Sequence, residues 1–299
     1  MSTVKTKIDQ ELVLTYLREH FDDAVSSVDF IAGGESSQAF SFHSKGSDFI
    51  VRVNKSDRSF RKDRYAFEHF ASVAIPIPQI VHIGQGEGYA FAISTMASGT
   101  TIKNLPSSEL PAVLPELIST LDAIHSTDIL SQKGFGKWNT DGIGEFDSWK
   151  DFVLGVGIHL DSGKLFETTF LEREVWAKVY AEIERLTAFC PQEKFLVHGD
   201  YGFDNLVSDG KKVTGVLDWA ESMYGDFVYD VAWLGFWSRE KSELYEKHYR
   251  ERNISHFEER LLCYKLRIGL GSLSFYAYSQ QKDKYDVVRE RVLKLLSNI

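Results

Sequence analysis

The chain has 299 residues, of which 43% are hydrophobic and 26% are charged, and its formal net charge is −9 at pH 7. This composition suits a globular protein with a large core, in one domain or two lobes, and no apolar run approaches the length of a membrane span. The acidic balance argues against a nucleic-acid partner, which would need basic patches, and it is compatible with a cationic substrate.

The first part of the chain is expected to form a small lobe of five strands with one helix among them. Ahead of the strands, apolar residues recur at helical spacing between Ile8 and Phe21, which predicts an amphipathic helix. The strand-like runs are residues 28–31, 39–43, 49–53, 80–83 and 89–94. A helix over residues 59–73 separates the third run from the fourth. These elements predict a nucleotide-binding lobe over residues 1–96.

A glycine pair lies between the first two strand-like runs, in the sequence AGGESSQ (32–38). Backbone N–H groups of such a segment can approach an anion, so Gly33, Gly34, Ser36 and Ser37 are candidates for contact with nucleotide phosphates. The segment is not a Walker A motif, because no Gly-Lys-Ser/Thr follows it. An ordinary hairpin turn is the alternative interpretation.

The third strand-like run places one cation on a defined face. By the period-two rule, Ile50 and Arg52 point away from the face that carries Val51. Protein kinases have a lysine in this strand that contacts the α- and β-phosphates and pairs with a helix glutamate. We expect Arg52 to take that place, with Asp63 favoured over Glu68 as its partner. A surface arginine on an edge strand is the alternative.

After residue 94 the pattern changes from strands to helices. Ser94 and Met96 belong to a segment, STMASG (94–99), positioned like a kinase hinge whose backbone holds adenine. A helix with Pro111 in its first turn follows, and further helices are expected over residues 149–160, over 171–189 and over most of the chain after Asp218. The stretch 132–147, rich in Gly and Trp, looks like an inserted loop. We expect a larger, mainly helical lobe over residues 97–299.

The stretch FLVHGDYGFDNLVSDGKKVTGVLDWAE (195–221) carries the chemistry. Asn205 lies five residues after Asp200, and Asp218 lies eighteen residues after it, at the end of a predicted β-hairpin. Phosphoryl transfer to an alcohol needs one carboxylate to accept the hydroxyl proton, and an amide oxygen with a second carboxylate to hold Mg²⁺ against the phosphates. Asp200, Asn205 and Asp218 match these roles in that order. A hairpin with turn-forming Asp and Asn residues is the structural alternative.

HGDYGFDN followed by VLDW, and then by GDFVYDVA (225–232), resembles the pattern of the aminoglycoside phosphotransferase and choline kinase superfamily. Within it, whole phrases are similar to the hygromycin B phosphotransferases. They are ESSQAFSF (35–42), VRVN (51–54), KDRYAFEHFAS (62–72), PIPQI (76–80), ELPAVL (109–114), GFGKWNTDGIGEF (134–146) and LGFW (234–237). Departures at Gly199, Phe203-Asp204, Asp230 and Arg239-Glu240 leave the chemistry intact and the exact acceptor open.

The resemblance implies an α+β, bilobal protein-kinase-like fold that uses ATP with Mg²⁺. It implies that Asp200 is the base, that Asn205 and Asp218 are the metal ligands, and that residues 33–38 cover the phosphates. The implied acceptor is a hydroxyl of an aminoglycoside antibiotic, hygromycin B foremost, and the implied consequence is resistance. Whether GTP replaces ATP, and which hydroxyl is modified, stay open.

Acidic and aromatic residues after Asp218 are candidates to bind a polycationic acceptor: Glu221, Asp226, Trp237 and Glu240. A solvated helix face and a packed tryptophan are the alternatives. A metabolic kinase of an amino alcohol or sugar shares the same motifs and is the second hypothesis. A non-catalytic nucleotide-binding protein is disfavoured because the base and both metal ligands are present, and a protein kinase because no A-P-E motif follows Asp218.

The remaining expectations concern the state of the protein in the cell. The N-terminus lacks the apolar core of a signal peptide, and only two cysteines occur, Cys190 and Cys263. We therefore expect a reduced, cytoplasmic protein without a disulfide framework or metal cluster. We also expect a monomer that has neither a nucleic-acid nor a membrane partner.

Overall fold

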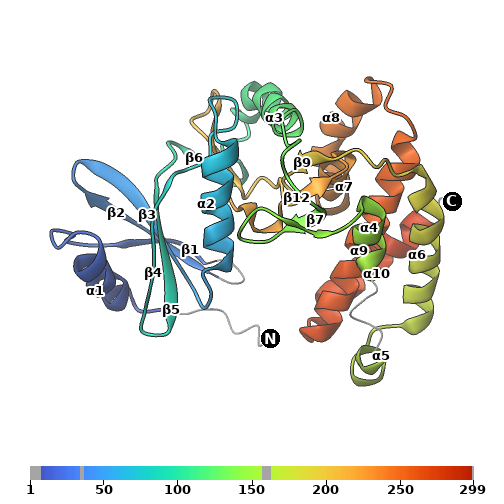
Figure 1. Cartoon of the computed structure of the whole chain (residues 1–299), viewed down its shortest axis with the longest axis horizontal. Coiled ribbons are helices and arrows are strands. Elements are labelled where there is room, and N and C mark those ends of the chain that lie inside the picture. The colour runs from blue at the N-terminus through green and yellow to red at the C-terminus, as the bar shows by residue number, and fades with distance from the viewer. Residues whose placement is uncertain (1–7, 34–36, 157–162, 298–299) are drawn as a thin grey trace. The chain divides into compact units, whose positions relative to one another are not determined.

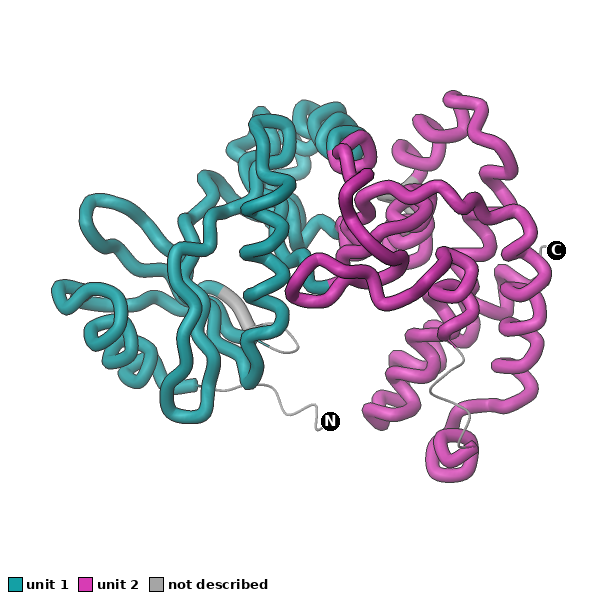
Figure 2. Tube along the Cα trace, viewed as in Figure 1, with its two compact units in different colours: residues 1–123, 202–220 teal, residues 124–201, 221–299 magenta. Residues whose placement is uncertain are grey.

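The structure, a computed structural model, describes residues 8–33, 37–156 and 163–297 (Figure 1). The chain divides into two compact units, residues 1–123 with 202–220 and residues 124–201 with 221–299 (Figure 2). The expected lobes over 1–96 and 97–299 stay a prediction about the functional domains.

The first unit is built on an antiparallel five-stranded sheet with the order β1-β2-β3-β5-β4. Its elements are α1 (Gln10–His20), β1 (Asp29–Gly33), β2 (Gln38–Ser44), β3 (Ser47–Asn54), α2 (Arg58–Phe70), β4 (Ile80–Gly86) and β5 (Tyr89–Thr95). The first helix, the five strands and the helix among them are confirmed.

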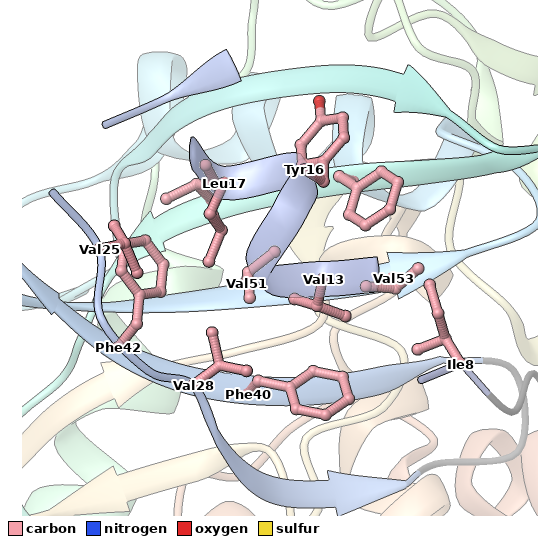
Figure 3. Close-up of a cluster of buried hydrophobic side chains, with 12 residues drawn as sticks. Ile8, Val13, Tyr16, Leu17, Val25, Val28, Phe40, Phe42, Val51 and Val53 are labelled. Atoms are coloured by element: carbon pink, nitrogen blue, oxygen red, sulfur yellow. The ribbon is translucent and has the colours of Figure 1, made fainter. Parts of the chain in front are cut away.

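The two faces of this sheet have different partners, as side-chain alternation requires. Val13, Tyr16 and Leu17 of α1 pack on Val51 and Val53 of β3 (Figure 3). On the opposite face Phe60 of α2 packs on the small residues Ala90 and Ala92 of β5. Fully burying one such aliphatic or aromatic side chain contributes about 1.5–3 kcal/mol. Arg52, between the two β3 valines, therefore belongs to the face that α2 covers.

A smaller sheet completes the first unit, with the order β11-β10-β6. Its elements are β6 (Thr100–Thr101), the 3₁₀ turn Ile102–Asn104, α3 (Leu110–His125), β10 (Leu206–Ser208) and β11 (Val213–Val216). Strands β10 and β11 form the predicted hairpin, and Asp209 Oδ1 accepts the backbone N–H groups of Lys211 and Lys212 in its turn. Gly99 has φ +104°, and a Cβ there would lie 1.9 Å from the Ser208 carbonyl oxygen, so this position needs glycine.

The second unit combines a four-stranded sheet, with the order β8-β7-β12-β9, and a set of helices. The strands are β7 (Phe135–Trp138), β8 (Gly144–Phe146), β9 (Phe195–Val197) and β12 (Met223–Gly225). The helices are α4 (Trp149–Leu154), α5 (Lys164–Thr168), α6 (Arg173–Leu186), α7 (Val228–Trp237), α8 (Arg239–Arg250), α9 (Phe257–Tyr278) and α10 (Lys282–Leu296), with a 3₁₀ turn at Thr187–Phe189. Another 3₁₀ turn, Trp219–Glu221, begins among the residues of the first unit and ends at Glu221 of the second.

Two expectations for this unit are corrected. The stretch 132–147 is not a plain loop, because β7 and β8 lie within it and β7 pairs with the distant β12. Of the helix expected over 149–160, α4 forms only the part that ends at Leu154, and residues 157–160 lie outside the described residues. None of the helices among the described residues has the length and apolar composition that crossing a bilayer requires.

Candidate active site

A cavity of about 330 Å³ lies in the first unit, and most of its walls are apolar. Lining residues from the sheet, the segment after β5 and the hairpin include Ala39, Ile50, Ile77, Met96, Ala97, Val207 and Leu217. Ser94 also lines it, as do the charged residues Arg52, Asp63 and Asp218. The fold thus brings together in one cavity the predicted hinge residues, the predicted phosphate-binding pair and one predicted metal ligand.

The Arg52 guanidinium pairs with Asp63, with Nη2 donating to Oδ2. The Phe60 ring centroid lies 5.1 Å from the guanidinium carbon, which fixes the cation further. Burial acts to lower the pKa of Arg52, but the charges of Asp63 and Asp218 outweigh it and raise this pKa above its ordinary value. The cation is therefore permanent, and the choice of Asp63 over Glu68 as its partner is confirmed.

Asp218 follows β11 in an unusual backbone conformation. Its φ is +59°, in the left-handed region that residues with a Cβ rarely adopt. Such strain costs roughly 1–3 kcal/mol and persists only where the surroundings enforce it, often at functional sites. Here the next residue is held firmly, because the Trp219 N–H donates to Asp63 Oδ1 at 2.8 Å. Lys62 also donates to the Ala220 carbonyl oxygen.

Asn205 and Asp218 lie at the same end of the β10–β11 hairpin. Asn205 directly precedes β10, where Leu206 pairs with Val216, and the Leu217 N–H donates to the Asn205 carbonyl oxygen at 2.8 Å. An amide oxygen and a carboxylate are thereby placed on adjoining segments of one unit. Both are hard oxygen donors, so the residues present fit Mg²⁺.

Asp200 belongs to the second unit, in the loop after β9. The preceding residue, Gly199, has φ +78°, and a Cβ there would lie 2.4 Å from the Glu221 carbonyl oxygen. Glycine is therefore required for the loop to pass beside Glu221. At the tip of its side chain, Asp200 Oδ1 accepts a hydrogen bond from Trp233 Nε1 at 2.9 Å.

A buried carboxylate on α7 holds the backbone of this loop. Asp230 Oδ2 accepts the His198 N–H at 3.0 Å, and Oδ1 accepts the Gly199 N–H at 2.7 Å. His125 Nε2 lies 3.0 Å from Oδ2, and the Tyr249 hydroxyl lies 3.0 Å from His125 Nδ1. The carboxylate can only accept, so Nε2 carries the proton toward it. His125 is itself buried, and its hydrogen bond supports the position of Asp230.

Trp233 was not among the site residues predicted from the sequence. Asp230 was noted only as a departure from a pattern. The available signal was their spacing: three residues apart on one helix, they lie on the same face, shortly after β12, the strand that pairs with β9 ahead of the Asp200 loop. The spacing does not show which atoms of the Asp200 loop this face of α7 contacts.

The residues expected to bind an acceptor have different surroundings. Glu221 pairs with Lys137, and its side chain is 46% exposed, so it can reach a ligand. Trp237 packs edge-on against Phe236 and Trp233, with ring centroids 5.0 and 5.9 Å away. The Glu240 side chain lies outside the described residues.

The expectation that Asp226 binds the acceptor is corrected by its surroundings. Its carboxylate is fully buried and accepts from Arg260 Nε at 2.8 Å and from the Tyr264 hydroxyl at 2.5 Å. Oδ1 also accepts the Val228 N–H at 3.1 Å, at the start of α7. Burial acts to lower the pKa of Arg260, but the bond and charge of Asp226 raise it overall. The Asp226 carboxylate is occupied inside the unit and does not face an acceptor.

The predicted phosphate cover is partly outside the described residues. Gly33 is the last residue of β1 and pairs with Gln38 of β2, so the segment between them joins the two strands. Ser37 is half-buried beside β2. Gly34 and Ser36 lie outside the described residues.

The chain is similar to known phosphotransferases along most of its length. Residues 27–262 match the phosphotransferase enzyme family. The chain is 36% identical over 279 residues to hygromycin-B 4-O-kinase of Escherichia coli, covering 90% of this chain and 80% of that protein. A crystal structure of aminoglycoside phosphotransferase APH(4)-Ia matches with a TM-score of 0.88 and 33% identity, over 97% of this chain and 99% of that one. A thermostable mutant of that protein, in a ternary complex with AMP-PNP and hygromycin B, matches with a TM-score of 0.87 and 33% identity, over 95% and 98% of the chains.

Proposed function

The chain belongs to the phosphotransferase enzyme family, an enzyme family with a protein-kinase-like fold, and from this we propose that it transfers phosphate from ATP to a hydroxyl of hygromycin B. The observation that carries the proposal is the similarity to hygromycin-B 4-O-kinase along nine-tenths of the chain. The Asp200, Asn205 and Asp218 pattern supports the reaction type independently of that similarity.

In the proposed reaction, Asp200 accepts the proton of the acceptor hydroxyl as its oxygen attacks the γ-phosphorus. The bond between that phosphorus and the β–γ bridging oxygen breaks, and ADP leaves. Asn205 and Asp218 would hold Mg²⁺, which when bound neutralises charge on the phosphates. The permanent charge of Arg52, supported by Asp63, suits contact with the same phosphates.

The cavity of the first unit is proposed to hold the nucleoside. Its apolar walls suit a flat base, and backbone groups near Ser94 and Met96 supply polar contacts of the kinase-hinge type. Gly33, Gly34, Ser36 and Ser37 are proposed to cover the phosphates, because this short glycine-containing connection between β1 and β2 can offer backbone N–H groups. ATP is a cytoplasmic metabolite, which supports a cytoplasmic location, and the monomeric state remains part of the proposal.

Acceptor binding is proposed to use carboxylates against ammonium groups. Glu221 is the best placed, because its backbone lies against Gly199, next to Asp200, and its side chain is half-exposed. Trp237 and Glu240 remain proposals for the same role. A partly exposed carboxylate contributes electrostatically, so the KM of a polycationic acceptor should rise with salt concentration.

The test is a panel assay with purified protein, Mg²⁺ and ATP. Hygromycin B, kanamycin, gentamicin, choline, ethanolamine and a hexose are each offered, and ADP release is followed together with the mass of the product. We expect hygromycin B to gain one phosphoryl group with the highest kcat/KM. Asp200→Asn is the matched inactive control. Turnover of an amino alcohol or sugar, with none of any aminoglycoside, would overturn the proposal in favour of a metabolic kinase.

A further inference from the structure

Trp233 lies on α7, and its indole Nε1 donates to Asp200 Oδ1 at 2.9 Å. We infer that Trp233 is a positioning residue for the catalytic base, which it holds in one orientation through this hydrogen bond. The inference rests on the proposed function, in which Asp200 accepts the hydroxyl proton.

The same helix holds the loop at a second place. Asp230, one turn before Trp233, accepts the backbone N–H groups of His198 and Gly199, which lead directly into Asp200. Asp230 is itself fully buried and braced by His125. Helix α7 therefore fixes both the backbone that carries the base and the carboxylate at its tip. Asp230 acts on the peptide groups, whereas Trp233 acts on the reacting side chain.

The chemistry of the indole suits this task. An indole N–H is a donor only, so it cannot take the proton that the base must receive. It favours the ionised carboxylate over the protonated one, which keeps the base ready to accept. Because it restrains the rotation of the carboxylate, the base has less freedom to lose during the reaction.

The indole is itself held by packing. The Trp237 ring lies edge-on to Trp233, with the centroids 5.9 Å apart, and Phe236 lies edge-on to Trp237 at 5.0 Å. A tryptophan side chain has only two rotatable bonds, so holding it costs little conformational entropy. A rigid donor on a helix positions its partner more accurately than a flexible one on a loop.

The functional test is Trp233→Phe, which keeps an aromatic ring and removes the donor. We expect kcat to fall on the order of tenfold, with the KM for ATP unchanged, because the lost bond is one to a charged group. The acidic limb of the kcat/KM profile should also move to higher pH, since the ionised carboxylate loses a donor. The substitution leaves the other titratable groups of this loop unchanged. They are His198, whose Nδ1 lies 3.2 Å from the Asp200 nitrogen, and the pair of Asp230 and His125.

Trp176→Phe is the matched control. Trp176 lies on α6 of the same unit and stacks on Tyr180, and its Nε1 is buried with no hydrogen-bond partner in the described part of the chain. The same substitution there removes an indole N–H without removing a bond to a carboxylate. We expect kcat and the pH profile of this variant to match the wild type.

A spectroscopic test does not depend on turnover. The ¹H–¹⁵N resonance of the Trp233 indole, assigned through its own backbone, should move in Asp200→Ala, while that of Trp176 should not. An unmoved Trp233 resonance would overturn the inference, because the contact would be absent. The inference would also be overturned if the resonance moves in Asp200→Ala while Trp233→Phe keeps the wild-type kcat and pH profile.

The two proposals fail in different ways. If the wild type phosphorylates none of the acceptors offered, the proposed function fails, whereas the indole resonance still reports on the Trp233–Asp200 contact. If Trp233→Phe does not fold, the resonance test is still available, because Asp200→Ala keeps Trp233. In the kinetic test, Trp233→His then takes the place of Trp233→Phe, because histidine keeps a ring N–H. If Trp233→His retains a higher kcat than Trp233→Leu, the donor role is supported. If the two variants lose kcat equally, the donor role is overturned.

Discussion

Asp63 Oδ1 accepts the backbone N–H of Trp219 at 2.8 Å, while Oδ2 of the same carboxylate pairs with Arg52. One residue of α2 thus joins a strand of the five-stranded sheet to the segment that directly follows Asp218. The carboxylate is buried and both of its oxygens are used, so its loss would take the hydrogen-bonded partner from a partly buried cation and the acceptor from the Trp219 N–H. A cation proposed to bind the nucleotide and a proposed metal ligand therefore depend on one side chain.

Asp63→Ala should destabilise the protein by about 3 kcal/mol, the lower end of the cost of breaking a buried ion pair, because the Arg52 side chain keeps 20% of its surface exposed. The KM for ATP should rise as well, because Arg52 and the backbone after Asp218 lose their support. Denaturant unfolding and ATP kinetics measure the two effects. Glu68→Ala on the same helix, where the side chain is exposed, is the control and should change neither. Equal losses in both variants would show that the Asp63 contacts are not responsible.

Asp200→Asn should lower kcat by roughly two orders of magnitude or more, because an amide cannot accept the hydroxyl proton. The amide oxygen can still accept from Trp233, so the loop should keep its structure. Calorimetry should find ATP binding unchanged, since the cavity proposed to hold the nucleoside is lined by residues of the other unit. Turnover near the wild-type level with saturating acceptor would remove Asp200 from the role of base.

Asp218→Ala and Asn205→Ala should each raise the Mg²⁺ concentration needed for half-maximal rate, since each removes a hard oxygen donor. The effect at Asp218 should be the larger, because a charged ligand is lost and water can replace a neutral amide oxygen. Rates measured across a Mg²⁺ titration at fixed ATP give the comparison. An unchanged Mg²⁺ dependence in both variants would place the ion elsewhere.

Asp226→Ala should cost about 3–5 kcal/mol of stability, because Arg260 is left charged and buried. Urea unfolding measures this cost, and the milder Asp226→Asn keeps the site testable if the alanine variant does not fold. The KM for the acceptor should not change in the folded protein, since the carboxylate faces inward. Glu221→Gln is the contrasting variant, with unchanged stability and a higher KM for a polycationic acceptor. A raised acceptor KM in Asp226→Asn would restore Asp226 as a ligand.

Stability should fall as the pH drops from about 7.5 to 5.5, in part because of His82. The Tyr16 hydroxyl lies 3.0 Å from His82 Nε2, and burial, with the nearby charges of His20 and Arg64, lowers the pKa of His82. The folded state therefore binds fewer protons than the unfolded state, whose histidines titrate near pH 6.5, so acid favours unfolding in that window. His82→Gln should flatten the pH dependence of the unfolding free energy, and an unaltered slope would contradict this assignment.

The sequence by itself determined the features that local pattern and spacing encode. Period-two alternation placed Arg52 on the face opposite Val51, and β3 shows that arrangement. The spacing of Asp200, Asn205 and Asp218, with Asp218 at the end of a predicted hairpin, indicated the reaction class. These features can be predicted from the sequence because they depend on residues close together in the chain, where the geometry of strands and turns is nearly constant.

Only the tertiary structure decided which buried polar groups meet. Asp226 looked like an acceptor ligand from its place after β12, yet its partner Arg260 lies 34 residues further on, in α9. Trp233 was not among the predicted site residues, yet its indole N–H donates to Asp200, 33 residues earlier in the chain. A buried charge or N–H must find a partner, and that requirement is general. The identity of the partner depends on how distant segments pack, which periodicity along one element does not record.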